Sequence, residues 1–403
     1  MSEWNVLDRV PEAGGVRGLL SRAVEASRAD DPAAAGMAHS WLFTGPPGSG
    51  RSEAAFAFAA ALAGLDRQTV EGESPGAWKD HVAAHPDILR VRAEGTRILV
   101  AAARDVIVPF AYRRPSGSPW RVVVVEEADR FNDETSNALL KVVEEPPSRT
   151  IFLMCAPSTN PRDFSVTLRS RCRHVYVPVP SVDEVAGLLR VDDPSLTEEQ
   201  ARWSATVANC HVGRARKLAH DPSVRDWREK ALRLAEGVFD PPVSYLRGAD
   251  LVSSAAAQAA HELEKREERE LEKLEESLGV GAKGRGAQAA ARGAKGQVNE
   301  LEKSQNRRRK RYERNLVDLA LMDVQALYRD ALRESLGAGG APITVDRGRT
   351  VAELVRRVPP ERLVACFDAV GAARGRLNSE LTLGSVIDGL IGELQIACRV
   401  GER

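Results

Sequence analysis

An eight-residue loop between an apolar strand and a helix constrains the fold of this chain more than any other feature. Residues 41–43 read Trp-Leu-Phe, and residues 53–62 after the loop have the composition of a helix. A glycine-rich loop in this context brings backbone N–H groups and a helix N-terminus together, as a phosphate-binding loop requires. The context predicts a parallel sheet wrapped by helices. The loop residues are Gly45, Pro46, Pro47, Gly48, Ser49, Gly50, Arg51 and Ser52.

The chemistry expected of this loop depends on Arg51 and Ser52. The Ser52 hydroxyl has the position of a Mg²⁺ ligand, while loops of this kind carry lysine where this chain has Arg51. A guanidinium is planar and broader than the compact ammonium of lysine, so the exchange is not conservative. We therefore expect the loop to bind ATP with Mg²⁺ weakly, or without hydrolysis.

A second chemical feature is the acidic end of a buried strand. Four valines, 122–125, are followed by Glu126 and Glu127. In nucleotide hydrolases with such a loop, the first acid orients the metal and the second polarises the attacking water. The first acid is usually Asp, so Glu126 extends one methylene further and predicts disturbed metal geometry. Glu127 has the position of the water-activating residue; the alternative interpretation is a solvated strand end.

Composition excludes several other classes of protein. Basic and acidic residues balance at 57 each, so any DNA contact must come from a local patch. The five cysteines include no C-x-x-C pair, which argues against a disulfide framework and against structural zinc, and is typical of the reduced cytoplasm. No run of 18 apolar residues predicts a membrane span, and the first ten residues do not resemble a signal peptide.

Three regions of the chain differ in their residue patterns. Residues 1–180 alternate short β-branched runs with helical patterns, 181–246 are helical with Val185, Leu188 and Leu189 at helical spacing, and 249–403 are also helical. Within the last region, residues 261–332 read as two charged helices, broken at Gly279–Gly296 by Gly, Ala, Lys and Arg. This pattern predicts an antiparallel helical hairpin.

The hairpin carries a basic block. Residues 283–314 contain eleven basic residues against three acids. Such a block contacts nucleic acid through phosphates, or it is a solvated helix face, and Tyr312 is its only aromatic residue. The sequence leaves both interpretations open.

Two stretches carry a specific resemblance to a known family. They are Asn137-Ala138-Leu139-Leu140-Lys141 followed by Glu144-Glu145-Pro146-Pro147, and Ser170-Arg171-Cys172. With the phosphate loop, they resemble the bacterial clamp-loader subunits of the AAA+ class, gamma/tau and delta′, over residues 40–219. The resemblance implies an AAA+ parallel-sheet domain of the P-loop NTPase type, a small helical lid, and an all-helical collar-type domain.

The same resemblance implies roles for three further residues. Arg171 corresponds to an arginine finger offered to the ATP of a neighbouring subunit, where it stabilises charge on the transferring phosphoryl group. The alternative for Arg171 is a surface arginine in an ion pair. Ser158 lies near the position that senses the γ-phosphate, and Arg214 near that of a second sensor arginine in the lid.

Departures from the family pattern favour a subunit of the delta′ type over a motor subunit. Residues 64–97 contain no cysteine, so we expect no zinc, and the Gly-Gln pair of gamma/tau is missing around residues 10–12. The charged hairpin resembles an insertion in actinobacterial chains. The resemblance implies a cytoplasmic replication protein of the polymerase (nucleotidyltransferase) holoenzyme, with gamma/tau and delta subunits, the sliding clamp and primed DNA as partners. A self-sufficient AAA+ ATPase and a DNA-binding protein with a vestigial AAA+ domain are the alternatives.

Overall fold

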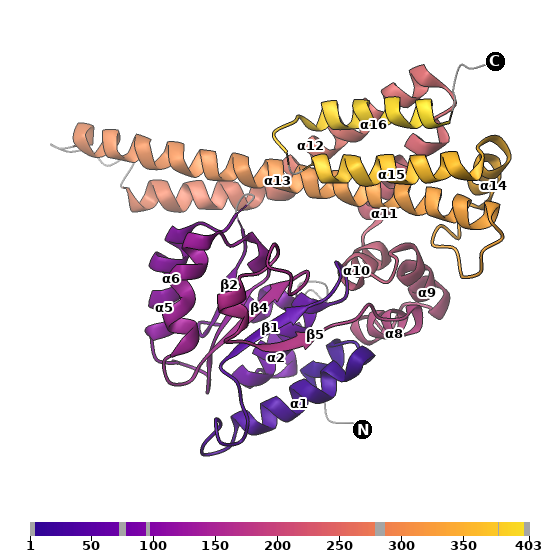
Figure 1. The fold of residues 1–403 in the computed structure, drawn as a ribbon. Helices are drawn as coiled ribbons and strands as arrows, with labels where there is room; N and C mark the ends of the chain where they lie inside the picture. Colours follow the sequence, from indigo (N-terminus) through magenta and orange to yellow (C-terminus); the bar gives the residue numbers. More distant parts are fainter. Residues whose placement is uncertain (1–4, 72–77, 94–96, 279–286, 378, 399–403) are drawn as a thin grey trace. The chain divides into compact units, whose positions relative to one another are not determined.

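The computed structural model describes residues 5–71, 78–93, 97–278, 287–377 and 379–398. The chain divides into two compact units (Figure 1). The first comprises Met1–Ala93 with Arg97–Pro222, and the second begins at Ser223. We describe each unit by itself.

The first unit is built on a parallel sheet of five strands. The strands are β1 (Ser40–Thr44), β2 (Ile88–Val91), β3 (Arg121–Val125), β4 (Thr150–Ala156) and β5 (Arg173–Tyr176), in the order β2-β3-β4-β1-β5. Their register pairs Leu42 with Met154 and Val123 with Phe152. Because β1 lies in the interior of the sheet, the loop that follows it opens at the carboxyl edge. The predicted parallel sheet is confirmed.

Alternate side chains of the central strands fill two cores. Val122 and Val124 pack with α1 (Val16–Ser27) and α2 (Arg51–Ala63), and Val123 and Val125 pack on the opposite face of the sheet. That face is covered by η4 (Ala102–Ile107), α5 (Val108–Tyr112) and α6 (Asp133–Glu144), as Figure 1 shows. Burial on both faces explains why β3 carries four consecutive valines, 122–125. Asn132 caps α6 by accepting a hydrogen bond from the Thr135 N–H.

Three helices complete the first unit beyond the sheet. Ser181 and Glu184 form a reciprocal capping box at the start of α8, and Thr197 and Gln200 form one at α9. Val185, Leu188 and Leu189 are buried, as their helical spacing predicted. The helices are α8 (Val182–Asp192), α9 (Glu198–Val207) and α10 (Val212–His220). This three-helix lid and the sheet belong to the same compact unit.

Short helices fill the connections of the first unit. They are η1 (Val6–Arg9), η2 (Ala13–Gly15), α3 (Arg67–Glu71), α4 (Trp78–Ala83), η5 (Ala128–Arg130) and α7 (Val166–Arg169).

The second unit is entirely helical in the residues described. Trp227 of the first helix, α11, and Leu251 and Ala255 of α12 belong to one buried core, so both helices contribute to it. The sequence-based boundary at residues 246–249 therefore falls inside a helix. The helices are α11 (Pro222–Glu236), α12 (Pro241–Ser277), α13 (Ala287–Ser335), α14 (Gly348–Arg357), α15 (Pro360–Arg376) and α16 (Leu383–Ala397).

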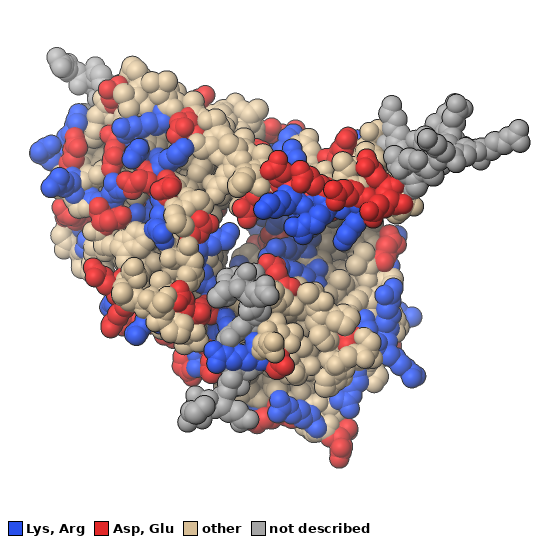
Figure 2. All heavy atoms as spheres, turned by 180° about the vertical axis from the view of Figure 1, so that it is seen from behind, with Lys and Arg blue, Asp and Glu red and all other residues tan. Residues whose placement is uncertain are grey.

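The long helices α12 and α13 run side by side as an antiparallel pair (Figure 1). The predicted break at 279–296 is too long, because α13 already begins at Ala287; residues 279–286 lie outside the described residues. Arg308 donates to Glu270 over 2.9 Å, and Arg309 donates to the buried Glu267 over 2.6 Å. Figure 2 shows acidic and basic side chains in adjacent rows on this hairpin. Two residues of the basic block therefore stabilise the hairpin itself.

None of the helices within the described ranges is long and apolar enough to cross a membrane.

A pair of glycines tests the packing of the second unit. A Cβ on Gly248 of α12 would stand 2.6 Å from Cδ1 of Ile391 and 2.9 Å from Cγ2 of Ile387. We expect Gly248→Ala to lower the free energy of unfolding of this unit by about 1 kcal/mol, because overpacking outweighs the gain in helix propensity. Amide hydrogen exchange in α12 and α16 measures the stability of this unit alone.

Gly389→Ala is the matched control. Gly389 lies in α16, is exposed, and no atom lies within 4 Å of its added Cβ. Because alanine favours helix more than glycine does, Gly389→Ala should raise the free energy of unfolding by about 0.5–1 kcal/mol. If both variants shift exchange in the same direction, the close contact between α12 and α16 is wrong.

Candidate functional site

The phosphate loop connects β1 to α2 at the carboxyl edge of the sheet. The Gly45 N–H donates to the Pro157 carbonyl over 3.2 Å, and α2 begins at Arg51. Gly45, Gly48 and Gly50 have φ values of 153°, 87° and 94°. These left-handed conformations fold the loop around the N-terminus of α2, whose first-turn N–H groups have no acceptors within the helix.

Packing inside the protein explains two of these glycines. A Cβ on Gly45 would stand 2.1 Å from the Val177 carbonyl oxygen, and one on Gly48 would stand 2.5 Å from the His211 ring. In addition, the Val212 N–H donates to the Gly48 carbonyl over 3.2 Å. The start of α10 therefore lies directly on the loop. Burial, followed by the charge of Arg214, lowers the pKa of His211 to about 4, so this ring is neutral at physiological pH.

Two side chains of the loop carry buried polar atoms without partners. Among the described residues, neither the Ser49 hydroxyl nor Nη1 of Arg51 has a hydrogen-bond partner. Burial lowers the pKa of Arg51, while Cys155, Asp129 and Asp163 act in the opposite direction. Unsatisfied buried donors cost free energy, and an anion with several acceptor oxygens would satisfy them. The loop is therefore suited to a phosphate group.

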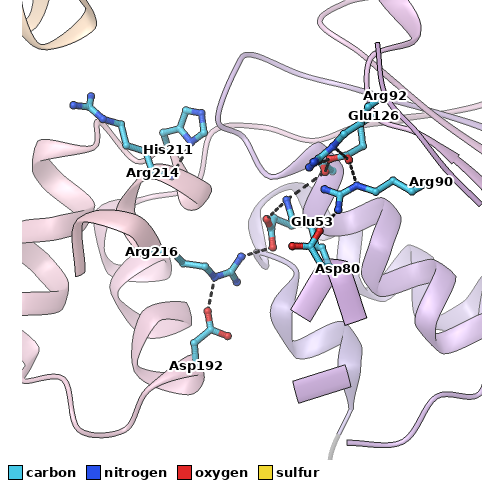
Figure 3. Close-up of polar contacts among 11 residues, drawn as sticks. Glu53, Asp80, Arg90, Arg92, Glu126, Asp192, His211, Arg214 and Arg216 are labelled. Carbon is cyan, nitrogen blue, oxygen red and sulfur yellow. Dashed lines mark hydrogen bonds and ion pairs between the residues drawn. The ribbon is translucent and has the colours of Figure 1, made fainter. Parts of the chain in front are cut away.

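Glu126 lies beside this loop and is bound by two arginines. It accepts a hydrogen bond from the Ser52 hydroxyl over 2.6 Å. Arg90, at the end of β2, donates to the same carboxylate, and Arg92 donates to it over 2.5 Å (Figure 3). The Glu126 side chain is only 9% exposed. Its negative charge is thus neutralised by protein cations.

A third cation lies close to the same oxygens. Nζ of Lys79 is 3.5 Å from the Ser52 hydroxyl and 2.9 Å from Glu53. A Mg²⁺ ion requires several oxygen ligands in octahedral geometry and is repelled by nearby positive charge. Ser52 and Glu126, the two expected ligands, are instead surrounded by Lys79, Arg90 and Arg92. The residues at this position do not fit a magnesium ion.

Glu53, the third residue of α2, holds the lid to the loop helix. Arg216 of α10 donates to Glu53, and its Nε donates to Asp192 of α8 over 2.5 Å (Figure 3). Asp192 also accepts from Arg9 over 2.5 Å. Burial alone would raise the pKa of Glu53, but the charges of Arg216 and Lys79 outweigh it and lower the pKa to about 2. The result is a buried chain of alternating charges across four elements, η1, α8, α10 and α2.

The lid arginine that faces the loop helix is Arg216, not Arg214. In Figure 3 the guanidinium of Arg216 points to Glu53, whereas that of Arg214 points away from it. Both residues are buried, and the Arg214 N–H donates to the capping His211 side chain over 3.2 Å. The structure therefore does not bring the predicted sensor arginine, Arg214, toward Glu53.

The other predicted site residues have partners within the first unit. Glu127 accepts from the Ala93 N–H over 3.2 Å. The Ser158 hydroxyl donates to Asp163 over 2.6 Å and accepts from the Asn160 N–H. These two residues lie at the carboxyl ends of β3 and β4, on the same edge of the sheet as the phosphate loop.

Arg171 follows α7 and folds back onto its own unit. Its guanidinium donates to the Thr167 carbonyl over 2.9 Å and is paired with Glu144 at 2.9 Å. Its side chain is 29% exposed and that of Glu144 is 54% exposed. An ion pair this exposed stabilises by only about 0–1 kcal/mol, so Arg171 can leave Glu144 at little cost.

Sequence reasoning missed Lys79, Arg90, Arg92, Glu53 and Arg216. None of these residues belongs to a local motif, because they approach one another from α4, β2, α2 and α10. One signal was available for Glu53: an acid inside an otherwise apolar helix segment, Glu53–Ala63, needs a buried cation as its partner.

The Glu53 carboxylate predicts a dependence of stability on pH. Its pKa is about 2 in the folded protein against an ordinary value of 4.5, so the stabilisation is fully present above pH 4.5 and is lost as the pH falls toward 2. We expect Glu53→Gln to remove this part of the pH dependence. At neutral pH it should lower the free energy of unfolding by about 3 kcal/mol, because Arg216 and Lys79 lose a carboxylate. Urea unfolding between pH 6 and 3 measures both effects.

Asp183→Asn is the matched control for this prediction. Asp183 pairs with Arg202 on the lid surface, and their side chains are 72% and 51% exposed. This change should alter stability by less than about 0.5 kcal/mol. Equal effects of the two variants would contradict a special role for the buried pair.

Comparison with known proteins finds similarity to subunits of one replication enzyme, DNA polymerase III. The family model described as "DNA polymerase III, delta subunit" matches residues 29–181. The tau subunit of DNA polymerase III from Bacillus subtilis is 32% identical over 51% of this chain and 43% of its own length. The delta′ subunits of Bacillus subtilis and Pseudomonas aeruginosa are 25% and 32% identical, over 54% and 36% of this chain.

These alignments cover 62% of the Bacillus delta′ subunit and 44% of the Pseudomonas one, so the chain spans about half the length of these relatives. The family model covers the phosphate loop, Glu126, Glu127, Ser158 and Arg171, while Arg214 lies beyond it. Residues 29–181 are therefore similar to DNA polymerase III subunits described as delta, delta′ and tau.

Proposed function

We propose that this chain is a non-motor clamp-loader subunit of the delta′ type. It completes a ring with gamma/tau and delta subunits in the cytoplasm, helps to load the sliding clamp onto primed DNA, and hydrolyses little or no ATP itself. The observation that carries the proposal is the state of Glu126, whose carboxylate binds Arg90 and Arg92. A subunit that does not hold Mg²⁺ beside its phosphate loop contributes to the ring through contacts with neighbouring subunits, and not through ATP hydrolysis of its own.

The proposed contribution to catalysis is Arg171. An arginine supplied in trans stabilises the charge that develops on the transferring phosphoryl group of a neighbour. Arg171 is partly exposed and only weakly paired with Glu144. Both facts support this role, because the guanidinium can leave the Glu144 carboxylate for the phosphate of a neighbour's ATP.

Two other functions find less support. A self-sufficient ATPase requires Ser52 and Glu126 to hold a metal, and three cations lie against them. A DNA-binding hairpin requires free basic side chains, and two of the eleven basic residues of the block, Arg308 and Arg309, are paired with Glu270 and Glu267. Both observations favour the non-motor role.

The isolated chain should have negligible ATPase activity. Arg51→Lys alone should not restore it, because Arg90 and Arg92 remain bound to Glu126. The measurement is steady-state phosphate release by the purified full-length chain and by the variant. A turnover on the order of 1 s⁻¹ or faster from either preparation would contradict the proposal.

Arg171→Ala should slow hydrolysis by the assembled clamp loader while leaving assembly intact. At the site that Arg171 completes, the expected loss is on the order of 10³-fold or more. The measurement is the ATPase rate of the complex with clamp and primed DNA, with assembly checked by gel filtration.

Arg169→Ala serves as the control for the arginine finger. Arg169 lies two residues earlier and donates to the Thr159 carbonyl over 3.3 Å. It should leave the rate unchanged. A complex whose rate is the same with Arg171→Ala as with Arg169→Ala would show that Arg171 is a surface residue only.

A further inference from the structure

Cations lie beside the phosphate loop at the place where a metal ion would be expected, and they indicate a different way of binding phosphate. The loop offers donors for an anion: the first-turn N–H groups of α2, the Ser49 hydroxyl and Nη1 of Arg51. Ser49 is fully buried, and its hydroxyl lies inside the loop, 2.8 Å from the point where a Cβ on Gly45 would stand. These features are independent of the metal position.

The cations beside the loop are held in place by more than one contact. Arg90 donates to both Glu126 and Asp80, and its guanidinium lies over the Phe56 ring at 5.1 Å. Lys79 is held by Glu53 at 2.9 Å. Arg92 is 52% exposed and is therefore the least constrained of the three. Each of these three cations is paired with a carboxylate of the protein, and phosphate oxygens would bind Arg90 and Arg92 in exchange for Glu126.

We propose that this loop binds a diphosphate group without a divalent metal ion, with Arg90, Arg92 and Lys79 supplying the positive charge that Mg²⁺ supplies elsewhere. The diphosphate is that of a nucleotide or of inorganic pyrophosphate. Guanidinium and ammonium groups form charge-assisted hydrogen bonds to phosphate oxygens, and a guanidinium matches two of them at once. The inference concerns the chain's own loop and does not depend on Arg171.

The charge balance distinguishes this mode from a metal site. At a metal site, Glu126 attracts the ion, and its loss weakens ligand binding. In the proposed mode, Glu126 competes with the ligand for Arg90 and Arg92 and also repels the phosphate. Removal of its charge should therefore leave binding equal or make it tighter.

The test uses the full chain and two probes, ADP and inorganic pyrophosphate, in titration calorimetry. With EDTA, both the wild-type chain and Glu126→Gln should bind ADP, and Glu126→Gln should bind it as tightly or up to about tenfold more tightly, the effect of one nearby charge. Added Mg²⁺ should give no gain in affinity. Comparable affinity for pyrophosphate would identify the diphosphate alone as the ligand, and much weaker affinity would assign part of the binding to the nucleoside.

Three results would overturn the proposal. They are binding of neither probe in either medium, ADP affinity that rises about tenfold or more with Mg²⁺, and ADP affinity that falls about tenfold in Glu126→Gln. Asp183→Asn, which removes an exposed carboxylate on the lid, controls for a general change in charge. These measurements require no partner subunit, so they can fail while the ATPase of the assembled complex still responds to Arg171→Ala.

Discussion

The buried ion pair between Glu53 and Arg216 is the interaction on which the arrangement of the first unit depends. It joins the helix that begins at the phosphate loop to the last helix of the lid, and Asp192 and Arg9 extend it through the interior. Burying four charges is unfavourable unless each one is paired. Because the pairing succeeds only in one relative position of α2, α8 and α10, it fixes the lid on the loop, with His211 against Gly48.

Much of the fold could be predicted from local patterns. The parallel sheet, the buried strand with the four valines 122–125 and the apolar stripe of α8 follow from short-range rules, and the structure has them where the sequence predicted them. The start of α13 could not be found in this way, since Ala, Arg and Lys favour helix and outweigh the scattered glycines. Likewise α11 joins the second unit because Trp227 packs there, which depends on tertiary contacts.

In the candidate site, too, some features follow from local sequence patterns and others depend on tertiary contacts. The loop and the acid pair were visible as motifs, and the substitutions at Arg51 and Glu126 already predicted poor metal geometry. The structure adds cations that the motifs did not indicate: Arg90 and Arg92, which come from elsewhere in the chain, pair with Glu126, and Lys79 lies beside Ser52. Arg214 and Arg216 both lie on α10, and only the position of Glu53 decides which one faces the loop helix.

The contacts of Arg90 also bear on how such a site can change by mutation. Arg90 contacts Glu126, Asp80 and Phe56 at once. If the arginine is exchanged first, Asp80 loses its cation and Glu126 keeps only Arg92; if Glu126 is exchanged first, a guanidinium that is 13% exposed loses its most buried partner. Each single exchange should therefore change stability by an amount that depends on which partners are still present. Substitutions around Arg90 are coupled in this sense, an epistasis in which their order matters.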